Sequence, residues 1–289
     1  MKFFKKLFLP ITLPMKFIQE HFKAMLFLLL LFLLFAPQSE KDLTPNNLEE
    51  INLTGPIMDA TEIVTEIDEA ADNENIKGVL LSVNSPGGAV APSIEISYAI
   101  KRLRAKKPVV AYAKGTMASG SYYASIWANE IISNPGSMVG SIGVIMQGAD
   151  LSEIMSKIGI KTQGVHAGKY KQIGTPDRKW KDYEVNELNK VIQGTYDMFT
   201  KDVANARGLD ISERNNFANA HIFTASQAKA VGLVDALGVS YDAKLRVVEL
   251  SGVAEPVWNK EDKFDKIMKK LSASTAATLN TYFPALTLR

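Results

Sequence analysis

Short apolar runs and amphipathic stretches alternate along most of this chain. The runs at residues 76–83 (IKGVLLSV) and 108–113 (PVVAYA) are apolar on both faces, which predicts strands of a sheet covered on both sides. Further strand candidates continue the alternation at residues 51–53, 130–133, 141–146 and 160–165. Helices are predicted at residues 57–71, 93–103, 119–128 and Asp182–Arg207, with shorter ones across 208–250. This order is typical of an α/β domain.

The first forty residues follow a different pattern. Residues 25–36 (MLFLLLLFLLFA) hold no polar side chain, and five lysines against one glutamate precede them. A full crossing needs about 20 apolar residues, and the usable span reaches about 22–37 if Lys23 snorkels to the interface. No small-residue cleavage site precedes Pro37, so we favour an uncleaved signal anchor over a cleavable signal peptide or a buried core helix. The lysines keep the amino-terminal side cytoplasmic and direct the body to the periplasmic or extracytoplasmic side of a bacterial inner membrane.

These patterns divide the chain into five parts. They are a basic cytoplasmic leader (1–24), a transmembrane signal anchor (25–36), a linker (37–48), the α/β domain (49–250) and a carboxyl-terminal helical extension (251–289). The extension contains a lysine-rich amphipathic helix candidate at residues 260–271, to which the sequence assigns no role.

Charge and composition exclude several functions. The leader carries a net charge of +4 and the whole chain +2, so the body is mildly acidic and has no electrostatic footprint for nucleic acid. The chain has no cysteine, which excludes disulfides, thiolate metal sites and cysteine nucleophiles. With three histidines in all, a histidine-rich metal site is not expected.

Two turns that follow buried strands carry candidate chemistry. Residues 84–88 (NSPGG) form a glycine loop whose backbone N–H groups can hold an oxyanion or a phosphate, although a plain tight turn fits the same residues. Ser119 begins the next predicted helix, as an N-cap or as a nucleophile. If it is a nucleophile, its attack would form an oxyanion, and that oxyanion could accept hydrogen bonds from the N–H groups of both Gly88 and Gly120.

A serine nucleophile needs a base, and the residues alone leave its identity open. His166 or His221 would complete a Ser-His arrangement, whereas His21 lies on the other side of the apolar segment. A lysine kept neutral by burial is the alternative, and residues 167–174 (AGKYKQIG) offer Lys169 and Lys171.

Four motifs in one order resemble a known family. NSPGG (84–88), ASGSYY (118–123), GSIGV (140–144) and GKYK (168–171) are similar to motifs of the short form of bacterial signal peptide peptidase A, a membrane-anchored serine–lysine peptidase. The resemblance runs from about residue 48 to residue 250, and the leader fits it. It implies the Clp protease/crotonase fold, which is an α/β repeated ββα core with flanking helices, here preceded by an amino-terminal membrane helix.

The resemblance also implies roles for individual residues. Ser119 matches the family's nucleophile, and Lys171, the second lysine of GKYK, matches its general base. Ser141 matches a serine that holds the lysine amine in place. Gly88 and Gly120 match the oxyanion-hole amides.

Cofactors, partners and substrates follow from the same resemblance. No metal or organic cofactor is expected. The expected partners are apolar signal-peptide remnants, the membrane, and further copies of the chain in a ring whose active sites are shared between neighbours. Ser121 stands where the family usually has glycine, which bears on the shape of the substrate pocket. The competing hypotheses are a crotonase-like acyl-CoA enzyme and a non-catalytic membrane scaffold of the same fold.

Overall fold

The computed structural model describes residues 21–28 and 45–259. The chain divides into two compact units, residues 1–45 and residues 46–289. In the first unit, residues 21–28 form a helix. Within the described residues, no helix combines the length and apolar character that a membrane crossing requires. Most of the predicted anchor and all of the helix candidate at 260–271 lie outside the described residues.

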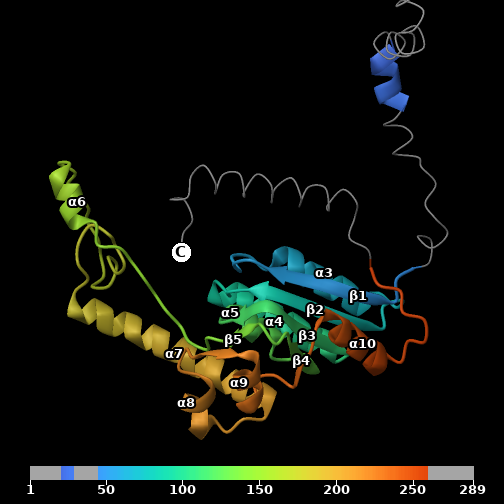
Figure 1. The fold of residues 1–289 in the computed structure, drawn as a ribbon. Coiled ribbons are helices and arrows are strands. Elements are labelled where there is room, and N and C mark those ends of the chain that lie inside the picture. Colours follow the sequence, from blue (N-terminus) through green and yellow to red (C-terminus); the bar gives the residue numbers. More distant parts are fainter. Residues whose placement is uncertain (1–20, 29–44, 260–289) are drawn as a thin grey trace, which may run out of the picture. The chain divides into compact units, whose positions relative to one another are not determined.

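A seven-stranded sheet is the centre of the second unit (Figure 1). Five of its strands lie side by side and all parallel, in the order β1 (Leu48–Thr54), β2 (Gly78–Ser85), β3 (Val109–Ala118), β4 (Glu130–Ser133) and β7 (Ala236–Leu237). Off this path, β5 (Met138–Gly140) pairs parallel with the end of β3, and β6 (Ile222–Thr224) pairs antiparallel with β5. The sheet is therefore mixed.

Helices bury both faces of this sheet. Successive side chains of a strand point to opposite faces, and in β2 Leu81 packs into the larger apolar cluster while Leu80 packs into the smaller one. The larger cluster includes side chains of α3 (Thr61–Asp72), α4 (Val90–Arg104) and α5 (Gly120–Ser125), and the smaller includes α10 (Ser240–Ser251). The sequence prediction of an α/β domain with a doubly covered sheet is confirmed.

The detailed pattern differs from the sequence prediction in two respects. Single strands alternate with single helices from β1 to β4, as the hydrophobic pattern predicts, and do not form the repeated ββα units that the family resemblance implies. Residues 141–146 and 160–165 form neither strand nor helix. Residues 161–165 are exposed, and a strand needs a neighbouring strand to pair its backbone groups.

One long helix leaves the sheet and carries a projecting segment (Figure 1). This helix, α7, spans Asp182–Arg207, the range that the sequence predicts. Its carboxyl-terminal half packs on the core through Phe199, Val203 and Ala204, whereas in its first three turns only Glu184 is buried. We call residues 145–190, which include α6 (Ser152–Lys157), the arm. After α7 come η2 (Ile211–Glu213), α8 (Arg214–Phe217) and α9 (Ala225–Ala230).

Candidate active site

Three turns meet at one edge of the sheet because the strands before them run parallel. Ser85 at the end of β2 pairs with Met117 of β3, and Ala118 at the end of β3 pairs with Gly140 at the end of β5. The residues that follow these strand ends must therefore lie close together. They include the glycine loop, Ser119 and Ser141.

Both serines occupy unusual backbone conformations. Ser119 has φ 53° and ψ −124°, and Ser141 has φ 51°. Such angles cost a residue with a Cβ about 1–3 kcal/mol, and surrounding contacts must hold them. The Ser119 N–H donates to the Gly140 carbonyl at 2.8 Å, and the Ser141 N–H donates to the His221 carbonyl at 2.7 Å. Within the described residues neither hydroxyl has a hydrogen-bond partner, so the Ser119 hydroxyl is free to meet a base.

The glycine loop approaches the Ser119 turn so closely that no side chain fits between them. Gly87 has φ +91°, and a Cβ there would lie 2.5 Å from the Gly120 nitrogen. A Cβ on Gly88 would lie 2.1 Å from the Ile57 carbonyl oxygen. Close packing on both sides thus requires glycine at these two positions.

Two backbone N–H groups border the space beside Ser119. A Cβ on Gly120 would lie 3.3 Å from the Gly88 nitrogen, so the two glycines are neighbours across the turns. Among the described residues neither the Gly88 N–H nor the Gly120 N–H has a hydrogen-bond acceptor. Unpaired N–H groups next to a nucleophile are the arrangement that stabilises a tetrahedral oxyanion.

A pocket with about 500 Å³ of empty space, open to solvent, lies in front of these groups. Ser119, Gly88 and Gly120 line it, together with apolar side chains that include Val90 and Met198. This composition favours an apolar, extended ligand over a charged one.

Tyr123 and Phe199 form one wall of the pocket. Their rings pack edge to face with centroids 4.7 Å apart. The Tyr123 hydroxyl donates to the carboxylate of Asp202, and burial together with this bond raises the pKa of Tyr123. The tyrosine therefore stays neutral and joins α5 to α7 at the pocket.

Ser121, which replaces the family's usual glycine, does not line the pocket. Its side chain is fully buried, and its Oγ accepts from the Ala118 N–H at 2.8 Å. The same hydroxyl lies 2.7 Å from the Ser85 carbonyl oxygen and 2.9 Å from that of Ala118, to one of which it donates. Ser121 thus ties the turn that carries Ser119 to the end of β2. The sequence marked this residue only as a departure, because its partner lies 36 residues away.

Lys171 lies in the arm and not at this pocket. Its side chain is exposed and makes no hydrogen bond or ion pair within the described residues. The turn that carries it contacts Tyr183 at the start of α7, whereas Thr195 further along α7 lines the pocket. At the helical rise per residue, Tyr183 and Thr195 are about 18 Å apart. A single chain therefore brings Ser119, Ser141, Gly88 and Gly120 together and leaves Lys171 apart.

Within the described part of the chain, no histidine lines the pocket. His166 is exposed in the arm. The backbone of His221 contacts that of Ser141, but its exposed ring packs beside Phe223, with centroids 6.0 Å apart. Among the described residues no group of three or more histidine, aspartate or glutamate side chains could hold a metal ion.

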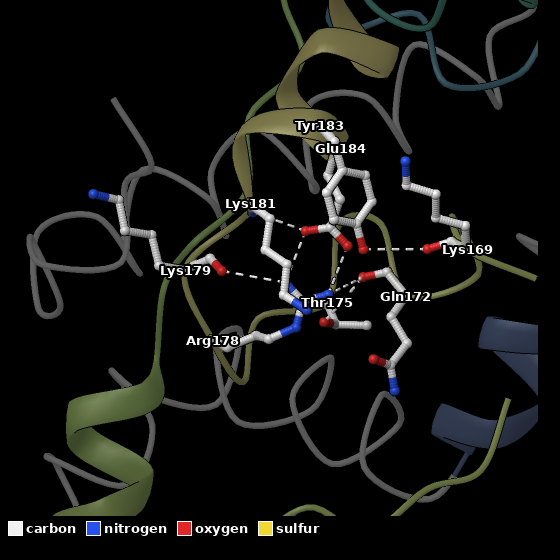
Figure 2. Close-up of polar contacts among 8 residues, drawn as sticks. All are labelled: Lys169, Gln172, Thr175, Arg178, Lys179, Lys181, Tyr183 and Glu184. Atoms are coloured by element: carbon white, nitrogen blue, oxygen red, sulfur yellow. Dashed lines mark hydrogen bonds and ion pairs between the residues drawn. The ribbon is translucent and has the colours of Figure 1, made fainter.

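Two charged residues that the sequence did not single out support the turn around Lys171 (Figure 2). The guanidinium of Arg178 donates to both carboxylate oxygens of Glu184, at 2.7 and 2.8 Å. The Glu184 carboxylate also accepts from the Lys181 N–H at 2.8 Å, at the start of α7. These hydrogen bonds, that of Arg178 foremost, lower the pKa of Glu184 from 4.5 to about 2.

Comparison with known proteins identifies the family. A family model described as peptidase family S49 matches residues 101–254, more than half of the chain. This chain belongs to peptidase family S49. The match includes Ser119, Gly120, Ser141 and Lys171, and Gly88 lies ahead of it.

Individual relatives agree with this membership. A protein of Methanocaldococcus jannaschii, provisionally named a protease, is 40% identical over 68% of this chain and 64% of its own length. A protein of Enterococcus faecium, provisionally named a signal peptide peptidase, is 33% identical over 62% of this chain and 53% of its own. The chain thus spans less than two thirds of either relative. The S49 family and these protease names support a serine peptidase.

Among solved structures, a ClpP1 mutant from Listeria monocytogenes is similar, with a TM-score of 0.48 and 17% identity. The similarity covers 67% of this chain and 93% of that one. This TM-score is too low to establish a common fold, so the fold of the S49 chain rests on the sheet and helices described above.

We expect Ser121→Ala to destabilise the S49 domain. Removing the hydroxyl takes away the buried hydrogen bonds that Ser121 makes with the Ala118 N–H and the Ser85 carbonyl, which costs about 1–3 kcal/mol of unfolding free energy. Urea unfolding followed by circular dichroism measures the loss. Ser125→Ala is the matched control, because its buried hydroxyl bonds only the carbonyl four residues earlier, which helix geometry already pairs. Equal stability of the two variants would contradict this role of Ser121.

The pKa of Glu184 predicts how stability depends on pH. Because the folded-state pKa of about 2 lies below the ordinary 4.5, the ionised carboxylate stabilises the fold above pH 4.5, and this contribution is lost as the pH falls toward 2. The thermal midpoint of Glu184→Gln should therefore lie below that of the wild type at pH 7, and the difference should shrink below pH 4.5. Glu187→Gln, at an exposed ion pair on the same helix, is the control. A difference that stays constant from pH 7 to 3 would contradict the prediction.

Proposed function

We propose that this chain is a membrane-anchored serine endopeptidase with a Ser-Lys dyad, which degrades remnant signal peptides after secretion. The observation that carries the proposal is the Ser119 hydroxyl, which has no hydrogen-bond partner in the described part of the chain. It lies at an apolar pocket beside the N–H groups of Gly88 and Gly120, which have no acceptor there either. A nucleophile, two oxyanion donors and room for an apolar peptide are the parts that acyl transfer requires.

The chemistry uses the chain's own side chains. Neutral Lys171 takes the proton from the Ser119 hydroxyl, and the Ser119 Oγ attacks the carbonyl carbon of the peptide. The N–H groups of Gly88 and Gly120 stabilise the negative oxygen that forms. Lys171 then gives its proton to the leaving amine, and the acyl group stays on Ser119. Water, with Lys171 again as the base, releases the acyl group and restores both residues.

A second copy of the chain would complete the dyad. A lysine acts as a base only where burial holds its amine neutral, and Lys171 is exposed and far from its own Ser119. The arm also leaves apolar side chains in solvent, among them Ile154, Ile158 and Ile160, each more than half exposed. Packing of the arm on a neighbour in a ring-shaped homo-oligomer would cover these side chains. It would bring Lys171 of one copy to Ser119 and Ser141 of the next.

We expect Ser119→Ala and Lys171→Ala each to abolish hydrolysis of a fluorogenic peptide with an apolar, signal-peptide-like sequence. Because each copy would pair its own serine with a neighbour's lysine, an equimolar mixture of the two inactive variants, assembled together, should recover part of the activity. Lys161→Ala, which changes an exposed lysine of the same arm, serves as the control with normal activity.

Three outcomes would count against this mechanism. An inactive mixture in which the two variants, carrying different affinity tags, purify together as mixed oligomers would place the dyad within one chain. Full activity of Lys171→Ala with loss of activity in His166→Ala would make the histidine the base. An inactive wild type that assembles normally would favour the non-catalytic scaffold.

The place of the chain in the cell follows from its leader. We place residues 1–24 in the cytoplasm, the anchor of residues 25–36 in the inner membrane as a single pass, and the catalytic domain on the extracytoplasmic side. Such a site meets signal-peptide remnants where they are left after secretion, in the bilayer.

The anchor is tested by Leu30→Lys with Leu33→Lys in the full chain, because two charges in a short apolar run oppose insertion. The wild-type chain should stay with the membranes after carbonate extraction, and the double variant should move to the soluble fraction. External protease should digest the catalytic domain in spheroplasts and not in intact cells. The same fractionation for both chains would contradict the anchor.

A further inference from the structure

The backbone around Lys171 forms hydrogen-bonded turns, although the Lys171 side chain makes no hydrogen bond or ion pair within the described residues. The Lys171 N–H donates to the Gly168 carbonyl at 3.2 Å, and the Ile173 N–H donates to the Tyr170 carbonyl at 3.2 Å. The chain thus makes consecutive turns across residues 168–174, which we call the lysine turn. Turns of this kind, exposed and far from the sheet, need an outside support to keep one conformation.

Arg178 supplies that support on one side of Lys171 (Figure 2). One guanidinium nitrogen, already bonded to Glu184, lies 3.3 Å from the carbonyl of Gln172, the residue that follows Lys171. The other donates to the carbonyl of Lys179 at 3.2 Å. The planar guanidinium therefore connects the lysine turn, its own loop and α7, a task for which its fixed donor geometry is suited.

Glu184 is what holds the guanidinium in this orientation. It is the one side chain in the first three turns of α7 that is fully buried, and Arg178 is its charged partner. A buried carboxylate remains ionised only if it is paired and hydrogen-bonded. Both oxygens of Glu184 accept from Arg178, and the Lys181 N–H donates to it as well. The pair is therefore fixed at the start of the helix.

Tyr183 supports the other side of Lys171. Its hydroxyl lies 3.3 Å from the Lys169 carbonyl, and its ring packs edge to face against Tyr170 with centroids 5.6 Å apart. The Lys169 amine lies 4.7 Å from the centre of the Tyr183 ring. Lys171 is thus bracketed by two supports: Tyr183, which lies on the first turn of α7, and Arg178, which is held there through Glu184. The Lys171 amine itself remains available.

We propose that Arg178 and Glu184 are a positioning pair, which fixes the lysine turn on α7 so that the Lys171 amine reaches the Ser119 hydroxyl of a neighbouring copy. This inference rests on the proposed function, because it assigns the pair a role in a proton transfer that Lys171 performs. Neither residue touches the substrate. They act through the backbone of the turn, whose displacement by a fraction of a hydrogen-bond length slows a proton transfer.

The test compares kcat and KM of full-chain Arg178→Gln, Glu184→Gln and the double variant on the fluorogenic peptide. Each single variant should lower kcat by about 10- to 100-fold with KM unchanged, because the peptide pocket is intact and the base is misplaced. The double variant should be no slower than the slower single variant, because both changes break one unit. Arg178→Lys, which keeps the charge without the fork, should recover part of kcat.

Glu187→Gln is the matched control, because Glu187 is on the same helix and its ion pair with Lys190, at 2.8 Å, is exposed. It should keep normal kcat. Assays run at a temperature where circular dichroism shows every variant fully folded, and light scattering follows the oligomeric state. If kcat per assembled copy equals that of Glu187→Gln in both single variants, the positioning role is overturned. The positioning role is also overturned if KM and kcat change together in proportion to the loss of assembly.

Lys171→Ala in the same series separates the two proposals. If it keeps activity, the assignment of Lys171 as the base fails, whatever the pair does. If Lys171→Ala is inactive while Arg178→Gln and Glu184→Gln remain as active as the control, only the positioning role fails.

Discussion

The parallel pairing of β2, β3 and β5 is the constraint on which this site depends. Parallel strands end at the same edge of a sheet, so the register Ser85 to Met117 and Ala118 to Gly140 brings three following turns together. No side-chain contact is needed to collect them. Backbone hydrogen bonds then hold Ser119 and Ser141 at positive φ, and the helices on both faces of the sheet keep the strands in place.

The candidate site at this edge of the sheet depends on the close approach of two backbone segments, the loop after β2 and the Ser119 turn. Gly87 and Gly88 allow the loop after β2 to contact both Ile57 and the Ser119 turn, where any Cβ would collide. Ser121 joins the two turns, because its hydroxyl bonds both the Ala118 N–H and the Ser85 carbonyl. Rigid turns leave two N–H groups without acceptors at a defined spacing. Preorganised donors of this kind stabilise developing charge without the cost of reorientation.

The long helix α7 connects two parts of the chemistry that a single chain keeps separate. Its carboxyl-terminal half forms a wall of the pocket through Met198 and Phe199, and its first turn supports the lysine turn through Tyr183 and Glu184. In the ring that we propose, each α7 would therefore border the serine of its own copy and carry the lysine for the next. The Arg178–Glu184 pair, whose carboxylate is buried, would then serve a function in a segment with little core of its own, where burial of charge is otherwise costly.

Local patterns in the sequence were enough to predict the central strands and the long helix, and to name the candidate site residues. The apolar runs at 76–83 and 108–113 predicted the two central strands, and the absence of helix breakers predicted α7, because these signals depend on near neighbours in the chain. The ordered motifs indicated Ser119, Gly88 and Gly120. Residues 141–146 and 160–165 were wrong as elements, because an apolar run forms a strand only where a partner strand is present.

Contacts between distant residues were decided by the tertiary structure. The closeness of the two glycine N–H groups, the role of Ser121 and the support of Lys171 by Glu184 each join different elements, and no periodicity records them. The separation of Lys171 from Ser119 is of the same kind, because it depends on the direction of a helix. The sequence by itself determined the central strands, the long helix and the candidate reactive side chains of this protein. Only the tertiary structure decided which of them meet, since distances across the fold depend on register and packing and not on position along the chain.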